Sequence, residues 1–280
     1  MPTPVYPSDL TDAEWAVLEP LLPTPSTRGR RPKWTQRLVA DAVFYLLRTG
    51  CTWRALPKEY PPWPTVYWHF ARWRRTGALR VAHDRLRARV RAHEGRGPSP
   101  SGAVIDSQSV RTTERGGPER GYDGGKRLSG RKRHVLVDTS GLVLGACVHG
   151  ADVHDGQGAR RLLSPDLKAR LPHLEVIWTD HGYRGPIQAW AAEERGWRME
   201  VVRHRDRQLW RYGLEEKPMG FQVLPKRWVV ERTFAWLGRY RRLSKDYEYL
   251  PETSETMIYA AMTRLMLRRL TRPNPVPAAA

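Results

Sequence analysis

Residues 134–148 read HVLVDTSGLVLGACV, and this stretch decides the fold class of the sequence. Two apolar runs rich in Val and Leu flank a turn formed by Asp138 to Gly141, which is typical of a β-hairpin with buried strands. A third apolar run, Ala103 to Ile105, precedes the hairpin. Three strands are therefore expected in succession in this part of the chain.

Beyond the hairpin, helical and extended patterns alternate. We expect helices over about residues 156–163 and 186–194, strands over 174–178 and 199–202, and a further helix over about 227–237. Three strands followed by alternating helices and strands predict an α/β fold, with a mixed sheet flanked by helices.

Before the hairpin the pattern is helical. Thr11 and Glu14 have the spacing of a capping box, and apolar residues recur at helical spacing from Leu38 to Leu47. Two more helices are expected before Gly95, where a segment of Gly, Pro and Ser breaks the pattern. The predicted organisation is a small all-helical domain over residues 1–94, a linker over 95–101, an α/β domain over 102–272 and a disordered tail over 273–280.

The charge balance points to a polyanionic partner. Lys and Arg number 48 against 29 Asp and Glu, which gives a formal net charge of +19. A hydrophobic fraction of 40% excludes wholesale disorder, and no stretch approaches the roughly 20 apolar residues that span a bilayer. With two cysteines and no secretion signal, a cytoplasmic protein without a membrane partner is expected. Charge alone leaves a ribosomal, chromatin-type or membrane-surface protein open.

The basic helical segment resembles a helix-turn-helix DNA reader. Arg72, Arg74 and Arg75 flank the apolar face of its third predicted helix. The alternative is a helical bundle whose arginines are merely solvated, and a salt-dependent affinity for duplex DNA would separate the two. The tryptophans of this segment could stack on unpaired bases, although their spacing favours core packing; they are Trp53, Trp63, Trp68 and Trp73.

Three carboxylates are candidates for chemistry. Asp106 and Asp180 each end an apolar strand, so neighbouring strands would bring them together at one edge of the sheet. Two carboxylates that lie close together repel each other unless they share a proton or bind a cation, and Mg²⁺ is a cation that prefers oxygen ligands. Glu231, a charge within an apolar helix, is the candidate third ligand. Two such ions can activate a hydroxyl nucleophile and stabilise the leaving oxygen at phosphorus.

Each of these residues also has a simpler interpretation. Asp106 or Asp180 could cap a turn, and Glu231 could pair with Arg227 one helical turn before it. Spacing alone does not exclude three further aspartates, which are Asp138, Asp152 and Asp155. A metal site built from His149, Asp152, His154 and Asp155 is rejected, because loops rich in His and Asp are common turn builders.

These motifs together resemble the Asp-Asp-Glu transposases of bacterial insertion sequences, in the IS-four and IS-five superfamily. The matching pieces are Ile105-Asp106-Ser107-Gln108-Ser109, Asp180-His181-Gly182-Tyr183 and Arg227-Trp228-Val229-Val230-Glu231-Arg232, with the basic stretch Gly130 to His134. The resemblance covers nearly the whole chain. The family's Tyr-Arg-Glu-Lys signature is incomplete, because Leu224 and Gly238 stand at its Tyr and Lys positions.

The resemblance implies an RNase H-like catalytic domain in which Asp106, Asp180 and Glu231 hold two Mg²⁺ or Mn²⁺ ions. Arg227 would position a phosphate or orient Glu231. It also implies cleavage at the ends of a mobile element and transfer of the freed strand to target DNA. The partners would be the terminal inverted repeats and target DNA, bound by a homodimer or larger assembly at the nucleoid. This hypothesis requires the three carboxylates to lie within about 10 Å of one another.

The cations predicted to contact DNA come from both domains. Residues 111–133 are expected to form a basic loop that either clamps DNA or is simply solvated. The side chains predicted to bind DNA are Arg72, Arg74, Arg75, Arg131, Lys132, Arg133, Arg239, Arg241, Arg242 and Lys245.

Two other functions compete with transposition. One is an RNase H-like nuclease without joining activity, and the other is an inactive DNA-binding protein derived from a transposase.

Overall fold

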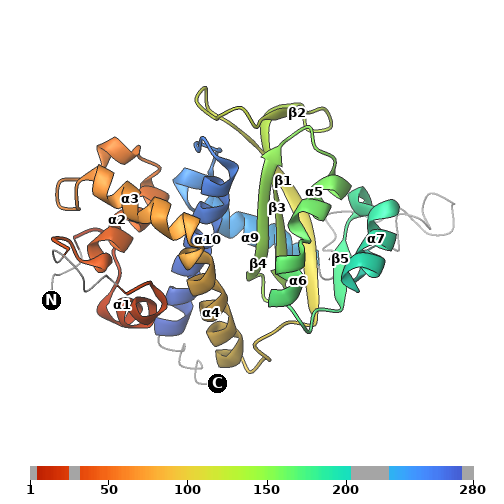
Figure 1. Ribbon diagram of the computed structural model, residues 1–280, viewed down its shortest axis with the longest axis horizontal. Coiled ribbons are helices and arrows are strands. Elements are labelled where there is room, and N and C mark those ends of the chain that lie inside the picture. Colours follow the sequence, from red (N-terminus) through yellow and green to blue (C-terminus); the bar gives the residue numbers. More distant parts are fainter. Residues whose placement is uncertain (1–4, 25–31, 203–226, 273–280) are drawn as a thin grey trace, which may run out of the picture. The chain divides into compact units, whose positions relative to one another are not determined.

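The computed structural model describes residues 5–24, 32–202 and 227–272, so the predicted tail over 273–280 lies outside the described residues (Figure 1). The chain forms two compact units. The first contains residues 1–98, 237–247 and 252–280, and the second contains residues 99–236 and 248–251.

The first unit is helical. Its capping box is present as predicted, since the amide of Glu14 donates to the Thr11 hydroxyl and the amide of Thr11 donates to the Glu14 carboxylate. The long C-terminal helix also belongs here except for its first residue, whereas the sequence places it in the α/β domain. Its contacts within this unit include a buried ion pair between Arg264 and Glu14 and a hydrogen bond from Arg264 to the carbonyl of Asp9. The elements are α1 (Asp12–Leu18), η1 (Glu19–Leu21), α2 (Gln36–Thr49), η2 (Trp53–Ala55), α3 (Trp63–Arg75), α4 (Ala78–His93), η4 (Arg241–Leu243) and α10 (Pro251–Thr271).

A buried carboxyl group in α2 gives the first unit a pH-dependent stability. Asp41 accepts the amide hydrogen of Leu10 at 2.8 Å, and burial, together with the nearby Asp9 carboxylate, raises the pKa of Asp41 to about 7. Because the folded protein holds this proton more tightly than the unfolded chain does, the contribution is complete below about pH 4 and is lost as the pH rises to about 7.

Asp41→Asn keeps an acceptor for Leu10 but cannot ionise. We expect its melting temperature to rise relative to the wild type as the pH increases from about 4 to about 7, because only the wild type must bury a charge. Thermal unfolding of both proteins across this range checks the prediction. A difference in melting temperature that does not change with pH would contradict it.

The second unit contains a mixed sheet, as the order of the predicted strands and helices indicates. Strands β1 (Gly102–Arg111), β3 (Leu128–Asp138) and β4 (Val143–Gly150) pair in antiparallel fashion, and β2 (Gly121–Asp123) also pairs with β3. On the other side of β1, β5 (Val176–Thr179) and β6 (Arg198–Val201) continue the sheet in parallel. The order is β2-β3-β1-β5-β6, with β4 on β3. One sheet thus joins an antiparallel half to a parallel half along β1.

Helices complete the second unit. α5 (Asp155–Leu162), α6 (Pro165–Arg170) and α7 (Pro186–Arg195) contribute to one apolar core with residues such as Ile105, Leu136 and Trp197. α6 was not predicted; Ser164 caps it by accepting the amide hydrogen of Leu167. α9 (Trp228–Gly238) begins in this unit, and the hydroxyl of Thr233 donates to the carbonyl of Gly141 in the β3–β4 turn. The core therefore fixes the strands that carry the candidate aspartates.

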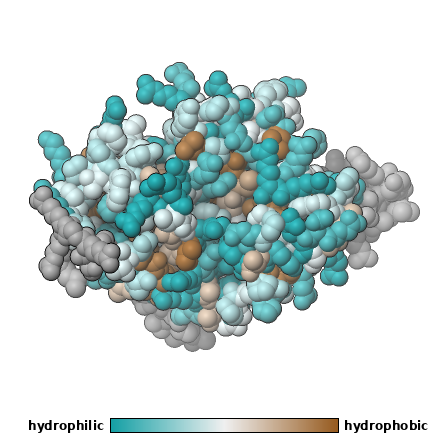
Figure 2. All heavy atoms as spheres, in the orientation of Figure 1, coloured by the Kyte–Doolittle hydropathy of each residue, from teal (hydrophilic) through white to brown (hydrophobic). Residues whose placement is uncertain are grey.

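Hydrophilic residues cover most of the face shown in Figure 2. Among the residues that the structure describes, no helix combines the length and apolar composition that crossing a membrane would need.

Candidate active site

The three candidate carboxylates meet at one arginine. Nη2 of Arg227 lies 3.8 Å from Oδ2 of Asp106, 3.9 Å from Oδ2 of Asp180 and 3.8 Å from Oε1 of Glu231. Because all three oxygens lie within 3.9 Å of the same nitrogen, no two of them are separated by more than twice that distance. The structure therefore gathers residues from β1, the turn after β5 and α9 within the 10 Å limit that the hypothesis requires.

Asp106 does not end its strand, contrary to the expectation. β1 continues to Arg111, and Asp106 lies opposite Val135 of β3. The parallel pairing with β5, however, stops at Val104, two residues earlier. Asp106 thus lies just beyond the point where β1 and β5 separate. Such points are where α/β sheets place ligands.

Asp180 follows β5 as predicted and has two roles. Its Oδ1 accepts the amide hydrogen of Gly182 at 2.9 Å and so caps the short helix η3 (His181–Tyr183). Its Oδ2 is the oxygen that faces Arg227. The simpler interpretation of this residue as a turn cap is therefore correct, and it leaves one oxygen available to the cluster.

Glu231 lies on α9, one helical turn after Arg227, which directly precedes the helix. The simpler interpretation of Glu231 as the partner of Arg227 in a helical ion pair is therefore also met. The Glu231 side chain is 52% exposed, against 31% for that of Asp180 and 17% for that of Asp106. Glu231 is therefore the member of the cluster with the greatest access to solvent.

The charges of the cluster call for a cation. Burial, followed by the nearby Asp180 carboxylate, raises the pKa of Asp106 to about 6, although the Ser107 amide and Arg227 oppose this shift. Among the described residues, no three His, Cys, Asp or Glu side chains form a ready metal cage, and the carboxylates surround a guanidinium group instead. A set of carboxylate oxygens that carries excess negative charge nevertheless fits a hard divalent ion.

Two known protein families match the chain. The family described as "Transposase DDE domain" matches residues 97–266, which is more than half of the sequence. The chain belongs to the DDE transposases. A second family, described as "Putative transposase of IS4/5 family", matches residues 10–83, so the helical segment has the same affiliation.

Individual relatives agree with this assignment. The "Putative transposase for insertion sequence element IS402" of Burkholderia cepacia is 30% identical over 125 residues, which are 42% of this chain and 54% of that protein. The match therefore spans about half the length of this relative. An uncharacterized 16.2 kDa protein of the same insertion element is 33% identical over 114 residues, covering 38% of this chain and 76% of that protein. The uncharacterized protein y4sN of Sinorhizobium fredii is 30% identical over 118 residues, covering 42% of this chain and 87% of that protein.

In this DDE transposase, three of the predicted DNA contacts are buried. Arg131, Lys132 and Arg133 lie on β3, not in a loop, and have 0%, 7% and 1% of their surface exposed. The expectation of one basic loop over residues 111–133 is therefore wrong for this part, because β3 pairs there with both β1 and β4. Lys132 donates to the carbonyl of Val153 and to Asp155, so its charge is already compensated.

The other predicted DNA contacts of the transposase belong to the first unit. Arg74 donates to the hydroxyl of Thr253, and Arg242 is buried and donates to the carbonyl of Cys51; these contacts indicate structural roles. Arg72 is half-buried. The exposed members are Arg75, Arg239, Arg241 and Lys245.

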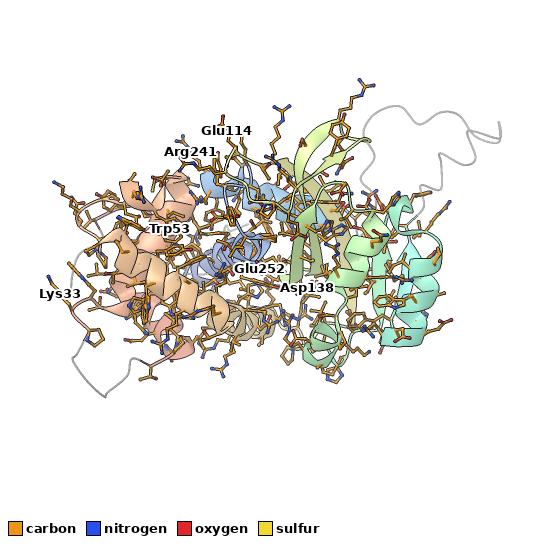
Figure 3. The ribbon with its side chains drawn as sticks, turned by 45° about the horizontal axis from the view of Figure 1, so that its top comes forward. Lys33, Trp53, Glu114, Asp138, Arg241 and Glu252 are labelled. Atoms are coloured by element: carbon orange, nitrogen blue, oxygen red, sulfur yellow. The ribbon has the colours of Figure 1, made fainter. Side chains whose placement is uncertain are left out.

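The tryptophans divide between core and surface. Trp73 is buried, in agreement with core packing, but Trp63 and Trp68 are 36% and 53% exposed. The guanidinium of Arg72 lies 5.6 Å from the ring centroid of Trp68. Trp53, labelled in Figure 3, packs against Phe70, with 5.2 Å between the ring centroids.

The structure also separates the alternative aspartates of the transposase. Asp138, labelled in Figure 3, is fully buried, and its Oδ1 accepts the amide hydrogens of Ser140 and Leu142, so it builds the hairpin turn. Asp155, by contrast, accepts a hydrogen bond from Ser107, the neighbour of Asp106. The sequence named Asp155 only among the aspartates that spacing does not exclude and in the rejected His and Asp cluster, since nothing in its local pattern distinguishes it from a helix-start aspartate. Of the two signature departures, Gly238 ends α9 and is exposed, and Leu224 lies outside the described residues.

Proposed function

We propose that this protein cleaves DNA at the ends of an insertion sequence and transfers the freed strands to target DNA. The observation that carries the proposal is the convergence of Asp106, Asp180 and Glu231 on Arg227 from three separate segments. A mixed sheet with β5 and β6 parallel to β1 supports an RNase H-like catalytic core. The DDE family assignment supports the same reaction.

The three carboxylates would hold two Mg²⁺ or Mn²⁺ ions, which supply an activated hydroxyl and stabilise the leaving oxygen when bound. Arg227 has a different task. If the ions took up the carboxylate charges, its guanidinium would be free to donate to phosphate oxygens of the scissile strand. Its distances of 3.8–3.9 Å to all three carboxylates are longer than hydrogen bonds, so no strong hydrogen bond to them must be broken.

The outer face of α3 would bind the terminal inverted repeats. Trp68 and Arg75 are exposed there, Arg72 lies over the Trp68 ring, and α3 contains no acidic residue. Arginine and aromatic side chains without nearby acids suit the phosphates and bases of DNA. Because two element ends must be held together for transfer, a homodimer or larger assembly is part of the proposal.

The double variant Arg72→Ala/Arg75→Ala tests this face. Each lost phosphate contact is expected to reduce the dependence of log affinity on log salt by about 1, so the slope should fall by about 2 while cleavage of saturating DNA persists. Titration of end DNA at several salt concentrations measures it. Arg198→Ala is a matched control, since Arg198 is an exposed arginine of β6 that pairs with Glu200. Equal slopes for both variants would refute the assignment.

The function itself is tested with the full chain, Mg²⁺ or Mn²⁺, and duplexes that carry the inverted repeats flanking its gene. Transposition predicts cleavage at the repeat ends followed by products in which those ends are joined to a second DNA. Free ends without joined products would favour the nuclease. DNA that binds but stays intact with either metal would favour the inactive DNA-binding protein.

A further inference from the structure

A second polar cluster lies beside the carboxylates, within the second unit. Its centre is Asp155, the first residue of α5. Oδ1 of Asp155 accepts from the hydroxyl of Ser107 at 3.0 Å and from Nζ of Lys132 at 3.1 Å. Nε2 of His134 lies 3.7 Å from the same oxygen. Asp155 thus connects α5 to β1, the strand that carries the first candidate aspartate, and to β3, the strand that pairs with it there.

Ser107 connects this cluster directly to Asp106. The amide of Ser107 donates to Oδ1 of Asp106 at 2.7 Å, while its hydroxyl donates to Asp155. One residue is therefore held by two carboxylates, through its backbone and through its side chain. The bond to the hydroxyl fixes the same short segment of backbone whose amide orients Asp106.

The other oxygen of Asp155 faces the turn that carries Asp180. A Cβ atom placed on Gly182 would come within 3.0 Å of Oδ2 of Asp155 and 3.1 Å of Oδ1 of Asp180. The amide of Gly182 already donates to that oxygen of Asp180. A side chain at position 182 would crowd both carboxylates, so Asp155 packs against the Asp180 turn as well as the Asp106 segment.

The charge on Asp155 is compensated differently from the charges at the candidate active site. The buried ammonium group of Lys132 donates to Asp155 at hydrogen-bonding distance and is held in place by the carbonyl of Val153 at 2.9 Å. Asp106, Asp180 and Glu231 face Arg227 only at 3.8–3.9 Å. Asp155 is therefore suited to holding its neighbours, whereas those three carboxylates are suited to receiving a cation.

We propose that Asp155 is a positioning residue for the cleavage reaction, and that it acts through Ser107 on Asp106 and through the Gly182 turn on Asp180. The inference rests on the proposed function, because it assigns a task toward the same carboxylates. Partners that orient metal ligands typically contribute about 10–100-fold in metal affinity or activity.

The test compares Asp155→Ala with Asp155→Asn and with Asp166→Ala. Asp166 is also a first-turn aspartate of a helix in the second unit, paired with Arg170, so it controls for lost helix charge. Asp155→Ala should reduce the cleavage rate on saturating DNA by about 10–100-fold without raising the DNA concentration needed for half-maximal rate. Asp155→Asn, which retains an acceptor oxygen, should recover part of that loss, and Asp166→Ala should cleave like the wild type.

Ser107 provides a second, matched pair. Ser107→Ala should show part of the Asp155→Ala defect, because it removes only the route to Asp106. Ser107→Thr should retain activity because it keeps the hydroxyl, and Ser107→Ala/Asp155→Ala should be no worse than Asp155→Ala alone. A second measurement needs no DNA: the melting temperature is followed as Mn²⁺ is added, and the Mn²⁺ concentration at half of the maximal increase is determined. This concentration should increase by about 10–100-fold in Asp155→Ala.

Two results would overturn the inference: an unchanged Mn²⁺ midpoint with cleavage lost only in proportion to unfolded protein, or equal activity of Ser107→Ala and Ser107→Thr. Failure of the proposed function is recognised separately. In that case the wild type itself does not cleave, and Asp106→Asn responds to Mn²⁺ as the wild type does.

Discussion

Asp106→Asn, Asp180→Asn and Glu231→Gln are each expected to reduce DNA cleavage by about 10³-fold or more, because removing one charged ligand costs several kcal/mol of transition-state stabilisation. Affinity for end DNA should stay close to that of the wild type, since none of the three side chains carries positive charge. Single-turnover cleavage of labelled end DNA, with binding measured in parallel, gives both quantities.

The stability of these variants separates lost chemistry from lost structure. In the metal-free protein the raised pKa of Asp106 reflects buried charge and repulsion by Asp180. Asp106→Asn should therefore be at least as stable as the wild type at pH 8 without metal, and should lose most of the stabilisation that Mn²⁺ provides. Glu175→Gln, an exposed change next to β5, should alter neither cleavage nor the response to metal. Full cleavage by any of the three variants would remove that residue from the site.

Local sequence patterns predicted the parts of this fold that depend on local interactions. The hairpin over residues 134–148 and the capping box at Thr11 are set by residues within a few positions of one another, and both are present. Asp180 could be placed because β5 is a short apolar run with a clear end. Asp106 could be named but not placed, since the extension of β1 depends on its pairing with β3.

Long-range contacts explain what the sequence did not predict. The C-terminal helix belongs to the helical unit, where Arg264 pairs with Glu14, a residue far away in the chain. Asp155 acquires its partners Ser107 and Lys132 only when three elements are assembled. A basic run also has the same composition whether it is solvated or buried, so Arg131 was assigned to DNA on charge alone.

Arg131 is instead a structural centre of the second unit. Its guanidinium group is fully buried and donates to four backbone carbonyls, those of Gly116 and Glu119 at 2.7 and 2.8 Å and those of Glu248 and Tyr249 at 2.7 and 2.8 Å. It therefore fastens two loops, distant from each other in sequence, to β3. A phosphate could reach this group only if these hydrogen bonds were broken.

Arg131→Met should consequently destabilise the protein without weakening a DNA contact. Breaking hydrogen bonds to buried groups costs about 1–3 kcal/mol for each group left unsatisfied, and some of these carbonyls can turn to water, so we expect a loss of about 3–5 kcal/mol. At about 2–4 °C per kcal/mol for a domain of this size, the melting temperature should fall by about 10 °C. Arg120→Met, in the same segment but exposed, should change it little. Below the melting temperature of Arg131→Met, the salt dependence of DNA binding should match that of the wild type. A normal melting temperature combined with a slope reduced by about 1 would instead return Arg131 to the DNA interface, because an exposed phosphate contact would produce that pair of results.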